Sequence, residues 1–259
     1  MLNKIAYLKR KTQILQKPVD PMGAIIGLAL IVAWFVSLYY FLDWQVNYWS
    51  LWTILAIYLQ THLYTGLFIT AHDAMHGSVS KNKKVNALLG RVTAILFAFN
   101  SYDRLIVKHH QHHKHVASDH DPDYHASGHF WKWYWSFLKS YITLKQMILV
   151  TVTLQLLRIF FPLENIILFW VLPSILSTFQ LFYFGTYLPH KDVDHNQNKH
   201  RSGSLRKNHV WAFLSCYFFG YHFEHHDAPG VPWWRLWQIK EPENEALPGI
   251  TIKEEPSAL

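Results

Sequence analysis

The stretch Lys108-His109-His110-Gln111-His112-His113-Lys114-His115 holds five of the chain's 18 histidines. In a helix, His109, His112 and His113 fall at positions i, i+3 and i+4, and they therefore lie on one face. Neutral imidazole is the commonest protein ligand for transition metals, so three rings on one face could bind an ion. The alternative is a solvated polar run, and this stretch alone leaves both interpretations open.

Two further histidine clusters have the same helical spacing. Upstream, His72 and His76 lie one helical turn apart. Downstream, His222, His225 and His226 repeat the i, i+3, i+4 pattern. Chance has little room to produce three clusters with this spacing, so together they predict a metal centre.

The number of histidines predicts two ions rather than one. A zinc ion takes three or four protein ligands, whereas the clusters supply eight: His72, His76, His109, His112, His113, His222, His225 and His226. Imidazole sites with open positions suit iron that activates oxygen. The single cysteine, Cys216, excludes a thiolate cage and an internal disulfide.

Carboxylates beside the clusters are candidates for orienting the ligand rings from behind. For the two in the loop after the second cluster, Asp121 and Asp123, a purely solvated role is the alternative. The full set of candidates is Asp73, Asp121, Asp123, Glu224 and Asp227.

Composition and patterning predict an all-α integral membrane protein. Hydrophobic residues make up 51% of the chain, aromatic residues 17%, and the apolar residues occur in long runs. As a helix, about 20 apolar residues cover the roughly 30 Å hydrocarbon core of a bilayer. We expect about four transmembrane helices, over residues 23–42, 48–71, 144–161 and 165–188, in a single membrane-embedded domain covering residues 1–259.

Two other apolar segments, residues 85–100 and 209–221, are short for a membrane span. A crossing at 85–100 would also put His72 and His109 on opposite membrane faces, which a shared metal site forbids. We therefore expect re-entrant or interfacial helices in these segments.

The basic residues predict how the chain is oriented. With four spans and the N-terminus inside, the inner segments carry every lysine and arginine except Arg158, with Lys145 at a boundary. The outer connections, 43–47 and 162–164, carry none, as the positive-inside rule requires. Both termini and all three histidine clusters are therefore predicted to be cytoplasmic. This topological role accounts for the net charge of +7, so nucleic acid is not expected as a partner.

The sequence patterns of the three clusters resemble those of a known family. H-x-x-x-H, H-x-x-H-H and H-x-x-H-H are the three boxes of the integral-membrane di-iron fatty acid desaturase and hydroxylase superfamily. Within it, the sequence resembles the bacterial carotenoid ketolases, the beta-carotene 4-ketolase family. The resemblance to the ketolases is carried by longer motifs in and around the clusters, which are FITAHDAMHG at 68–77, DPDYH at 121–125, LPH at 188–190 and HFEHHDAPGVPWW at 222–234.

The resemblance implies a carotenoid oxygenase in a prokaryotic inner or thylakoid membrane. Its substrate would be β-carotene, whose 4-methylene group in the β-ionone ring becomes a ketone, giving echinenone or canthaxanthin. The reaction would be an O2-dependent double hydroxylation and dehydration at two Fe2+ ions. The resemblance adds His190, at the end of the fourth span, as a ninth ligand, the alternative being an interfacial histidine. No residue outside the metal centre is assigned a catalytic or cofactor-binding role.

Electrons for such a reaction must come from another protein. The sequence has no Gly-rich nucleotide-binding fingerprint. The resemblance suggests a reduced ferredoxin as the donor, and basic cytoplasmic loops would suit an acidic partner.

Several alternatives use the same residues. A beta-carotene 3-hydroxylase or an acyl-lipid desaturase would carry the same boxes. A metal transporter should hold its histidines near the middle of its spans, whereas these lie at span ends, and a membrane scaffold would bind no metal. His110 could begin its own H-x-x-H, but only His109 completes the family pattern. His115, His120 and His125 are expected behind the ligands or on the surface.

Overall fold

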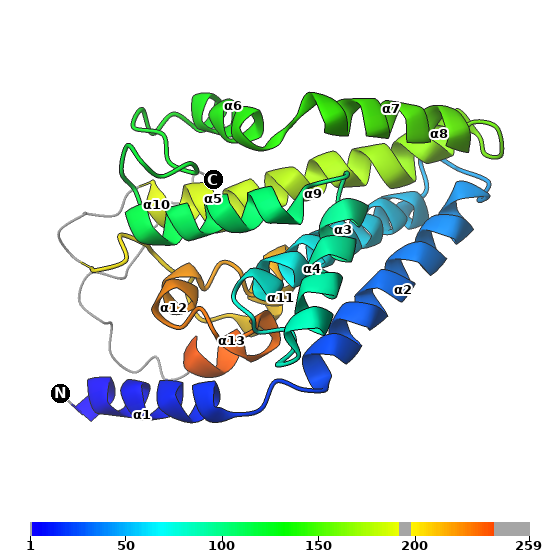
Figure 1. Cartoon of the computed structure of the whole chain (residues 1–259). Coiled ribbons are helices and arrows are strands. Elements are labelled where there is room, and N and C mark those ends of the chain that lie inside the picture. The colour runs from blue at the N-terminus through cyan, green and yellow to red at the C-terminus, as the bar shows by residue number, and fades with distance from the viewer. Residues whose placement is uncertain (1, 192–197, 241–259) are drawn as a thin grey trace. The chain divides into compact units, whose positions relative to one another are not determined.

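The computed structural model describes residues 2–191 and 198–240, and the regular elements in this part of the chain are helices (Figure 1). The C-terminus, which the charge pattern assigns to the cytoplasm, lies outside the described residues. The elements, with π-helical segments labelled η, are α1 (Leu2–Gln16), α2 (Met22–Leu42), α3 (Leu51–Met75), α4 (Lys83–Leu96), α5 (Tyr102–His115), α6 (Phe130–Tyr141), α7 (Leu144–Leu157), α8 (Leu163–Ile166), η1 (Ile167–Val171), α9 (Leu172–Phe182), η2 (Tyr183–Tyr187), α10 (Leu188–His190), α11 (His209–Cys216), α12 (His222–Asp227) and α13 (Trp233–Lys240).

The chain divides into two compact units, each discontinuous in sequence. The span unit comprises Val19–Val107 and Leu138–Gln180. The histidine unit comprises Met1–Pro18, Lys108–Phe137 and Leu181–Leu259, as far as these are described. The single domain expected over residues 1–259 stays a prediction.

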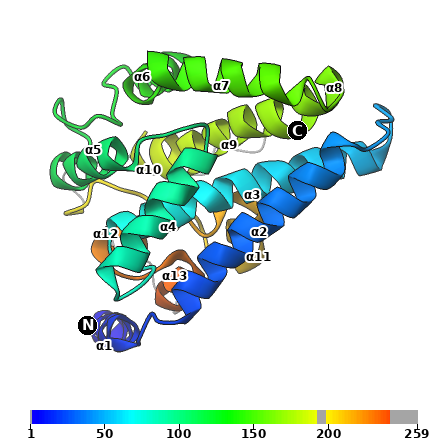
Figure 2. The same cartoon turned by 45° about the vertical axis from the view of Figure 1, so that its right-hand side comes forward.

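Among the described helices, three are long and apolar enough to cross a membrane, and each corresponds to a predicted span. They are α2, α3 and the continuous helix Leu163–His190, which runs from α8 to α10. The outer face of α2 is exposed yet apolar, as at Val36, which suits contact with lipid tails. Within the span unit, α2, α3 and α4 run side by side in both views (Figures 1 and 2).

The predicted span over residues 144–161 needs correction. Helix α7 ends at Leu157 after 14 residues, and about 21 Å of helix does not cover the hydrocarbon core. Only α6 and α7 taken together are long and apolar enough, and they are bent by 84° at the break between them. The chain therefore has three candidate spans in its described part, or four if this bent pair counts as one.

The two connections predicted to lie outside are held together in the span unit. The side-chain amide of Asn165 donates at 2.9, 3.2 and 2.7 Å to carbonyl oxygens at the end of α2, those of Phe41, Leu42 and Trp44. The Tyr48 hydroxyl donates to Glu164 at 3.2 Å. The end of the first span and the start of the last are therefore on the same side, as the predicted topology requires.

A buried asparagine fixes the turn that follows the first histidine cluster. The Asn86 amide donates to the carbonyl of Ala74 at 2.7 Å, and its oxygen accepts from the amides of Val79 and Ser80 at 3.3 Å. Asn86 lies on α4, which is not a candidate span among the described helices. This agrees with the expectation that residues 85–100 do not cross.

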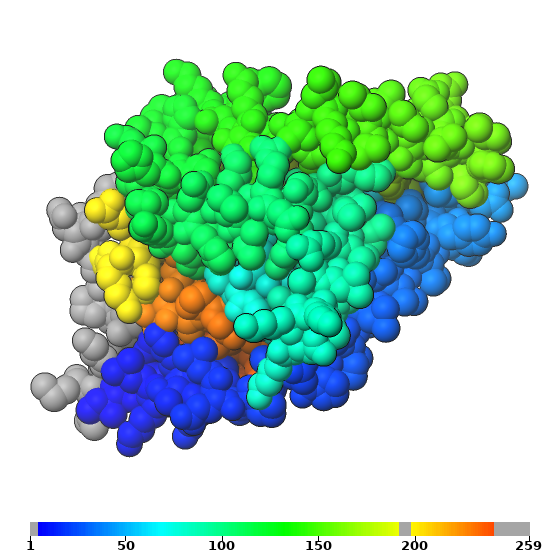
Figure 3. All heavy atoms as spheres, in the orientation of Figure 1, coloured from blue at the N-terminus to red at the C-terminus, as the bar shows by residue number. Residues whose placement is uncertain are grey.

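The histidine unit has a core of its own. Ile14 of α1 is buried in an apolar cluster with residues of α11, α13 and the turns between them, namely Ala212, Tyr221, Ala228, Val231, Leu236 and Ile239. In the space-filling view the blue surface of α1 lies beside the orange surface of α12 and α13 (Figure 3). The N-terminal helix is therefore an integral part of this unit.

Candidate metal centre

Three helices of the histidine unit carry seven of the nine predicted ligands. The second cluster lies on α5 and the third on α12, so both are helical, as their spacing predicts. His190 ends α10. The first cluster belongs to the span unit, where His72 lies in the last turn of α3 and His76 caps that helix.

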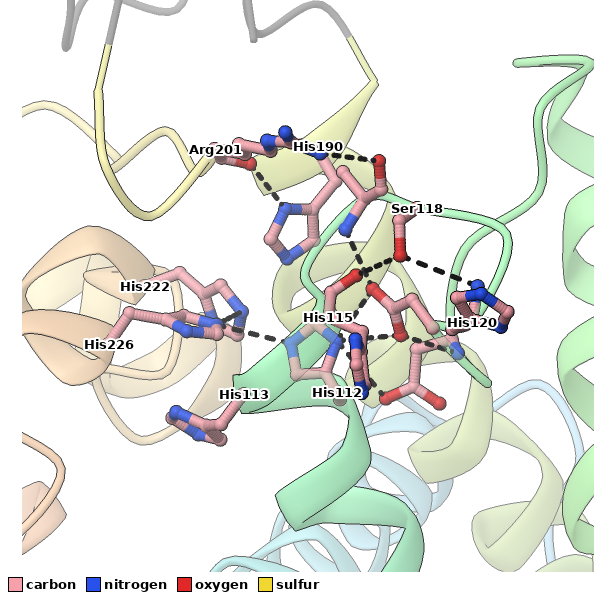
Figure 4. A network of polar contacts seen from close by, with 12 residues as sticks. His112, His113, His115, Ser118, His120, His190, Arg201, His222 and His226 are labelled. Atoms are coloured by element: carbon pink, nitrogen blue, oxygen red, sulfur yellow. Dashed lines mark hydrogen bonds and ion pairs between the residues drawn. The ribbon is translucent and has the colours of Figure 1, made fainter.

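Four of these histidines converge on one point. His112, His190, His222 and His226 are all buried, and each offers a ring nitrogen within 4.8 Å of the other three (Figure 4). The Nε2 atom of His226 lies 3.1 Å from Nε2 of His112 and 3.0 Å from Nε2 of His222. We call this set the four-histidine cluster.

The spacing in this cluster fits ligands of a single ion. Two nitrogens bound at roughly 2.1 Å from one ion and about 90° apart lie roughly 3 Å from each other. Burial, and then the charges of the neighbouring imidazoles, hold the pKa of His226 well below its ordinary value. The ring is therefore neutral and its lone pair is available to a metal.

The other predicted ligands are paired within each unit. In the histidine unit, Nε2 of His113 lies 3.0 Å from Nε2 of His225, and the ring of His109 is 4.5 Å from that of His113. In the span unit, the rings of His72 and His76 are 5.1 Å apart.

Asp121 orients His112 of the four-histidine cluster. Both of its carboxylate oxygens lie 3.0 Å from Nδ1 of His112. Asp121 is itself fixed by the backbone amides of Ala117 and Asp123, each at 2.9 Å. Burial disfavours a charged His112, but the hydrogen bond and charge of Asp121 outweigh burial and raise the pKa of His112. The Nδ1 proton is held by Asp121, which leaves Nε2 directed at the cluster.

A backbone carbonyl does the same for His190. Its Nδ1 lies 2.8 Å from the carbonyl oxygen of Arg201, so Nδ1 carries the proton and donates it. Sequence reasoning did not predict this contact, because nothing in the loop 198–202 distinguishes one carbonyl from another.

The other candidate carboxylates differ in what they contact. Asp73 lies 3.3 Å from Nδ1 of the adjacent His72, and Asp123 lies 3.9 Å from Nδ1 of His112. Glu224 instead accepts from Ser204 at 2.5 Å and pairs with the buried Lys240 at 3.2 Å. Asp227 binds cationic groups, which are described below.

An aromatic ring behind the third cluster was also missed by sequence reasoning. The Phe219 ring lies 5.2 Å from the His222 ring and 5.8 Å from the His225 ring. A Cβ at Gly185 would overlap Phe219, so only glycine permits this approach to η2. The one sequence signal was a glycine within an apolar span, and such glycines are too common in membrane helices to identify a partner ring.

Four histidines in or after the second cluster that are not predicted ligands, His110, His115, His120 and His125, are exposed or half-buried, whereas His62 within α3 is buried. His110 and His120 are exposed. His115 lines a cavity of about 370 Å³ in the histidine unit. The complete lining of this basic cavity is His113, Lys114, His115, Val116, Ser118, Lys199, His200 and Arg201. Because His113 is among them, the cavity reaches one of the predicted ligands.

Comparison with known proteins gives matches along most of the chain. A sequence model of the family described as "Fatty acid desaturase" matches residues 48–161 and 131–253. A zeaxanthin 4-ketolase of Chlamydomonas reinhardtii is 36% identical over 251 residues, which cover 88% of this chain and 56% of that protein. The beta-carotene ketolase of a Paracoccus species (strain N81106 / MBIC 01143) is 42% identical over 180 residues, covering 68% of this chain and 74% of the relative.

A second bacterial relative covers more of both chains. The beta-carotene ketolase of Paracoccus strain PC1 is 37% identical over 214 residues, covering 80% of this chain and 88% of the relative. The chain thus spans little more than half the length of the algal relative and most of the length of the bacterial ones.

Replacing Asp121 with asparagine tests its contact with His112. Asp121→Asn should weaken metal binding about 10–100-fold, because the neutral amide no longer holds the Nδ1 proton firmly. The measurement is metal content after dialysis against graded chelator concentrations. Asp119→Asn, at an exposed position in the same loop, is the matched control and should bind like the wild type. Equal metal retention in both variants would contradict the role of Asp121.

Proposed function

Because this chain belongs to the fatty acid desaturase family and, within it, to the beta-carotene ketolases, we propose that it converts the carbon-4 methylene of a β-ionone ring into a ketone. The observation that carries this proposal is the cluster of four buried, converging imidazoles in a chain whose relatives are named ketolases. The helices long and apolar enough for a bilayer would give an apolar carotenoid access from the membrane.

The proposed centre holds two irons. His112, His190, His222 and His226 would bind the first, which their mutual spacing supports. His109, His113 and His225 would bind the second. We add His72 and His76 to the second ion on the strength of their spacing in the sequence and of the family resemblance.

Bound iron would supply the activation of O2 for attack on the ring C–H bond. Two hydroxylations of one carbon followed by loss of water consume two O2, four electrons and four protons, and they release three waters. The protein's part is to hold neutral imidazoles in place. Asp121 and the Arg201 carbonyl do this by keeping the proton on Nδ1 of His112 and His190. Burial of the four histidines keeps bulk water away from their ring nitrogens.

We propose a reduced ferredoxin-type protein as the electron donor and the basic cavity as its docking point. Lys114, Lys199 and Arg201 line the cavity, and the Lys199 side chain is 69% exposed. A positively charged opening beside a predicted metal ligand favours an acidic partner.

We also propose that the histidine clusters face the cytoplasm. The supporting observations are the absence of lysine and arginine in the connections 43–47 and 162–164 and the hydrogen bonds that hold these two connections together.

Product analysis in a bacterial host that makes β-carotene tests the reaction. Ketone formation adds one oxygen and removes two hydrogens per ring, and it shifts the absorbance to longer wavelength. A 3-hydroxylase would add oxygen without loss of hydrogen, and an acyl-lipid desaturase would change fatty acids and leave the carotene intact. Either of these results would overturn the proposal.

Two neighbouring histidines provide the control in the same host. His109→Ala should abolish the ketone because it removes a ligand, whereas the exposed His110→Ala should retain substantial activity. Both proteins should reach the membrane fraction in equal amount, since insertion depends on the apolar helices. A dispensable His109 with an essential His110 would show that the ligand register on α5 is wrong.

Charge reversal at the cavity tests the donor site. Lys114→Glu should raise the KM for reduced ferredoxin by about tenfold at low salt. Turnover with a small chemical reductant should change much less. Lys84→Glu, at an exposed position of α4, is the control. If both variants respond equally to ferredoxin, docking at this cavity is wrong.

Reporter fusions test the orientation. A reporter after Lys84 should be cytoplasmic and one inserted in 43–47 should be external, because the intervening α3 is long enough to span the bilayer. Reporters on the same side would contradict the proposed orientation.

A further inference from the structure

Asp227 is a buried carboxylate with four donors. Its side chain is 5% exposed. Oxygen Oδ2 accepts from the Tyr7 hydroxyl at 2.9 Å and from Nζ of Lys11 at 2.7 Å. Oxygen Oδ1 lies 2.6 Å from Nζ of Lys199 and accepts from Nε2 of His200 at 3.0 Å. Both oxygens are therefore engaged, and the partners come from two distant parts of the sequence.

These partners join three segments of the histidine unit. Tyr7 and Lys11 lie on α1, Lys199 and His200 lie in the loop 198–202, and Asp227 is the last residue of α12. Helix α1 is also anchored at its C-terminal end, where the Arg235 guanidinium donates to the carbonyls of Lys17 and Pro18 at 3.1 and 2.6 Å. Asp227 thus connects the N-terminal helix to the helix that carries the third histidine cluster.

The loop 198–202 links Asp227 to a second proposed ligand, His190. The Asn198 side chain closes this loop, accepting from the His200 amide at 3.0 Å and donating to the Ser202 carbonyl at 3.1 Å. Between these residues, Arg201 offers the carbonyl that binds Nδ1 of His190 at 2.8 Å. One end of this short loop holds Asp227, and the other holds a ligand of the four-histidine cluster.

Helix α12 needs such an anchor. It has six residues, and a helix of this length is not stable on its own. A carboxylate in the last turn is also disfavoured by the helix dipole. The cations Lys11 and Lys199 offset that cost, so the position of Asp227 follows from its partners outside the helix.

We propose that Asp227 is a positioning residue for His226 and His190. Helix α1 contributes to this positioning because its residues Lys11 and Tyr7 hold the Asp227 carboxylate. The inference rests on the proposed function, because it assumes that these histidines bind iron. It assigns the N-terminal helix a role in ligand geometry.

The test measures how fast iron leaves the purified, iron-loaded protein when a ferrous chelator is added. Asp227→Asn and Lys11→Met should lose iron at least about tenfold faster than the wild type. Tyr7→Phe, which removes one hydroxyl and leaves the packing intact, should lose it about fivefold faster. Lys11→Arg, which keeps the charge, should behave like the wild type. Lys9→Met is the matched control, because Lys9 is exposed on the same helix.

A second readout separates positioning from general stability. The Mössbauer spectrum of the iron still bound should change in Asp227→Asn, because His226 and His190 are displaced, and a double Lys11→Met/Asp227→Asn variant should be no worse than Asp227→Asn alone. Iron loss from Lys11→Met and Tyr7→Phe at the rate of Lys9→Met would overturn the inference while leaving the proposed function intact. A wild-type chain that binds no iron would overturn both.

Discussion

The convergence of four buried imidazoles on one point is the constraint on which the remaining structure depends. Each neutral ring has one N–H and one lone pair, and burying such groups without partners is costly. Three Nε2 atoms joined by spacings of 3.0 and 3.1 Å use their lone pairs best when these point at a shared ion. This arrangement requires that every ring keep its proton on the far nitrogen, and the groups around His112 and His190 meet that requirement.

The proposed ligands His190, His222, His225 and His226 lie on short elements, which are in turn held by polar contacts. Asp121 fixes His112, the Arg201 carbonyl fixes His190, and the pair Glu224–Lys240 ties α12 to α13. The long apolar helices serve a different purpose. Helix α3 and the helix Leu163–His190 are long enough to span the bilayer, and each has a histidine at its C-terminal end. Apolar burial therefore determines the architecture, and hydrogen bonds to Nδ1 determine the ligand geometry.

Local periodicity explains what could be predicted from the sequence. His109, His112 and His113 were placed on one helix face because the 3.6-residue period is visible in the sequence, and the three longest spans were found because an apolar run has the length of a bilayer. The third predicted span, 144–161, does not form one helix of span length, because residues 130–157 contain two helices with a sharp break, and hydropathy alone does not register the bend.

The supporting contacts could not be predicted for a different reason. Tyr7 and Lys11 meet Asp227 across 220 and 216 residues, and a lone tyrosine or lysine in a basic helix carries no signal of such a partner. The same holds for Lys240 and for the Arg201 carbonyl. Among the candidate carboxylates, proximity in sequence to a histidine was a fair guide for Asp73, which contacts the adjacent His72. It was no guide for Asp227, whose carboxylate contacts α1 and the loop 198–202 instead.

Metal analysis combined with Mössbauer spectroscopy of the protein purified after growth in iron-57 tests the central claim most directly. We predict close to two irons per chain, in histidine-rich environments that respond together when oxygen is added to the reduced protein. A single metal ion per chain, or stoichiometric zinc after iron-replete growth, would contradict a di-iron centre.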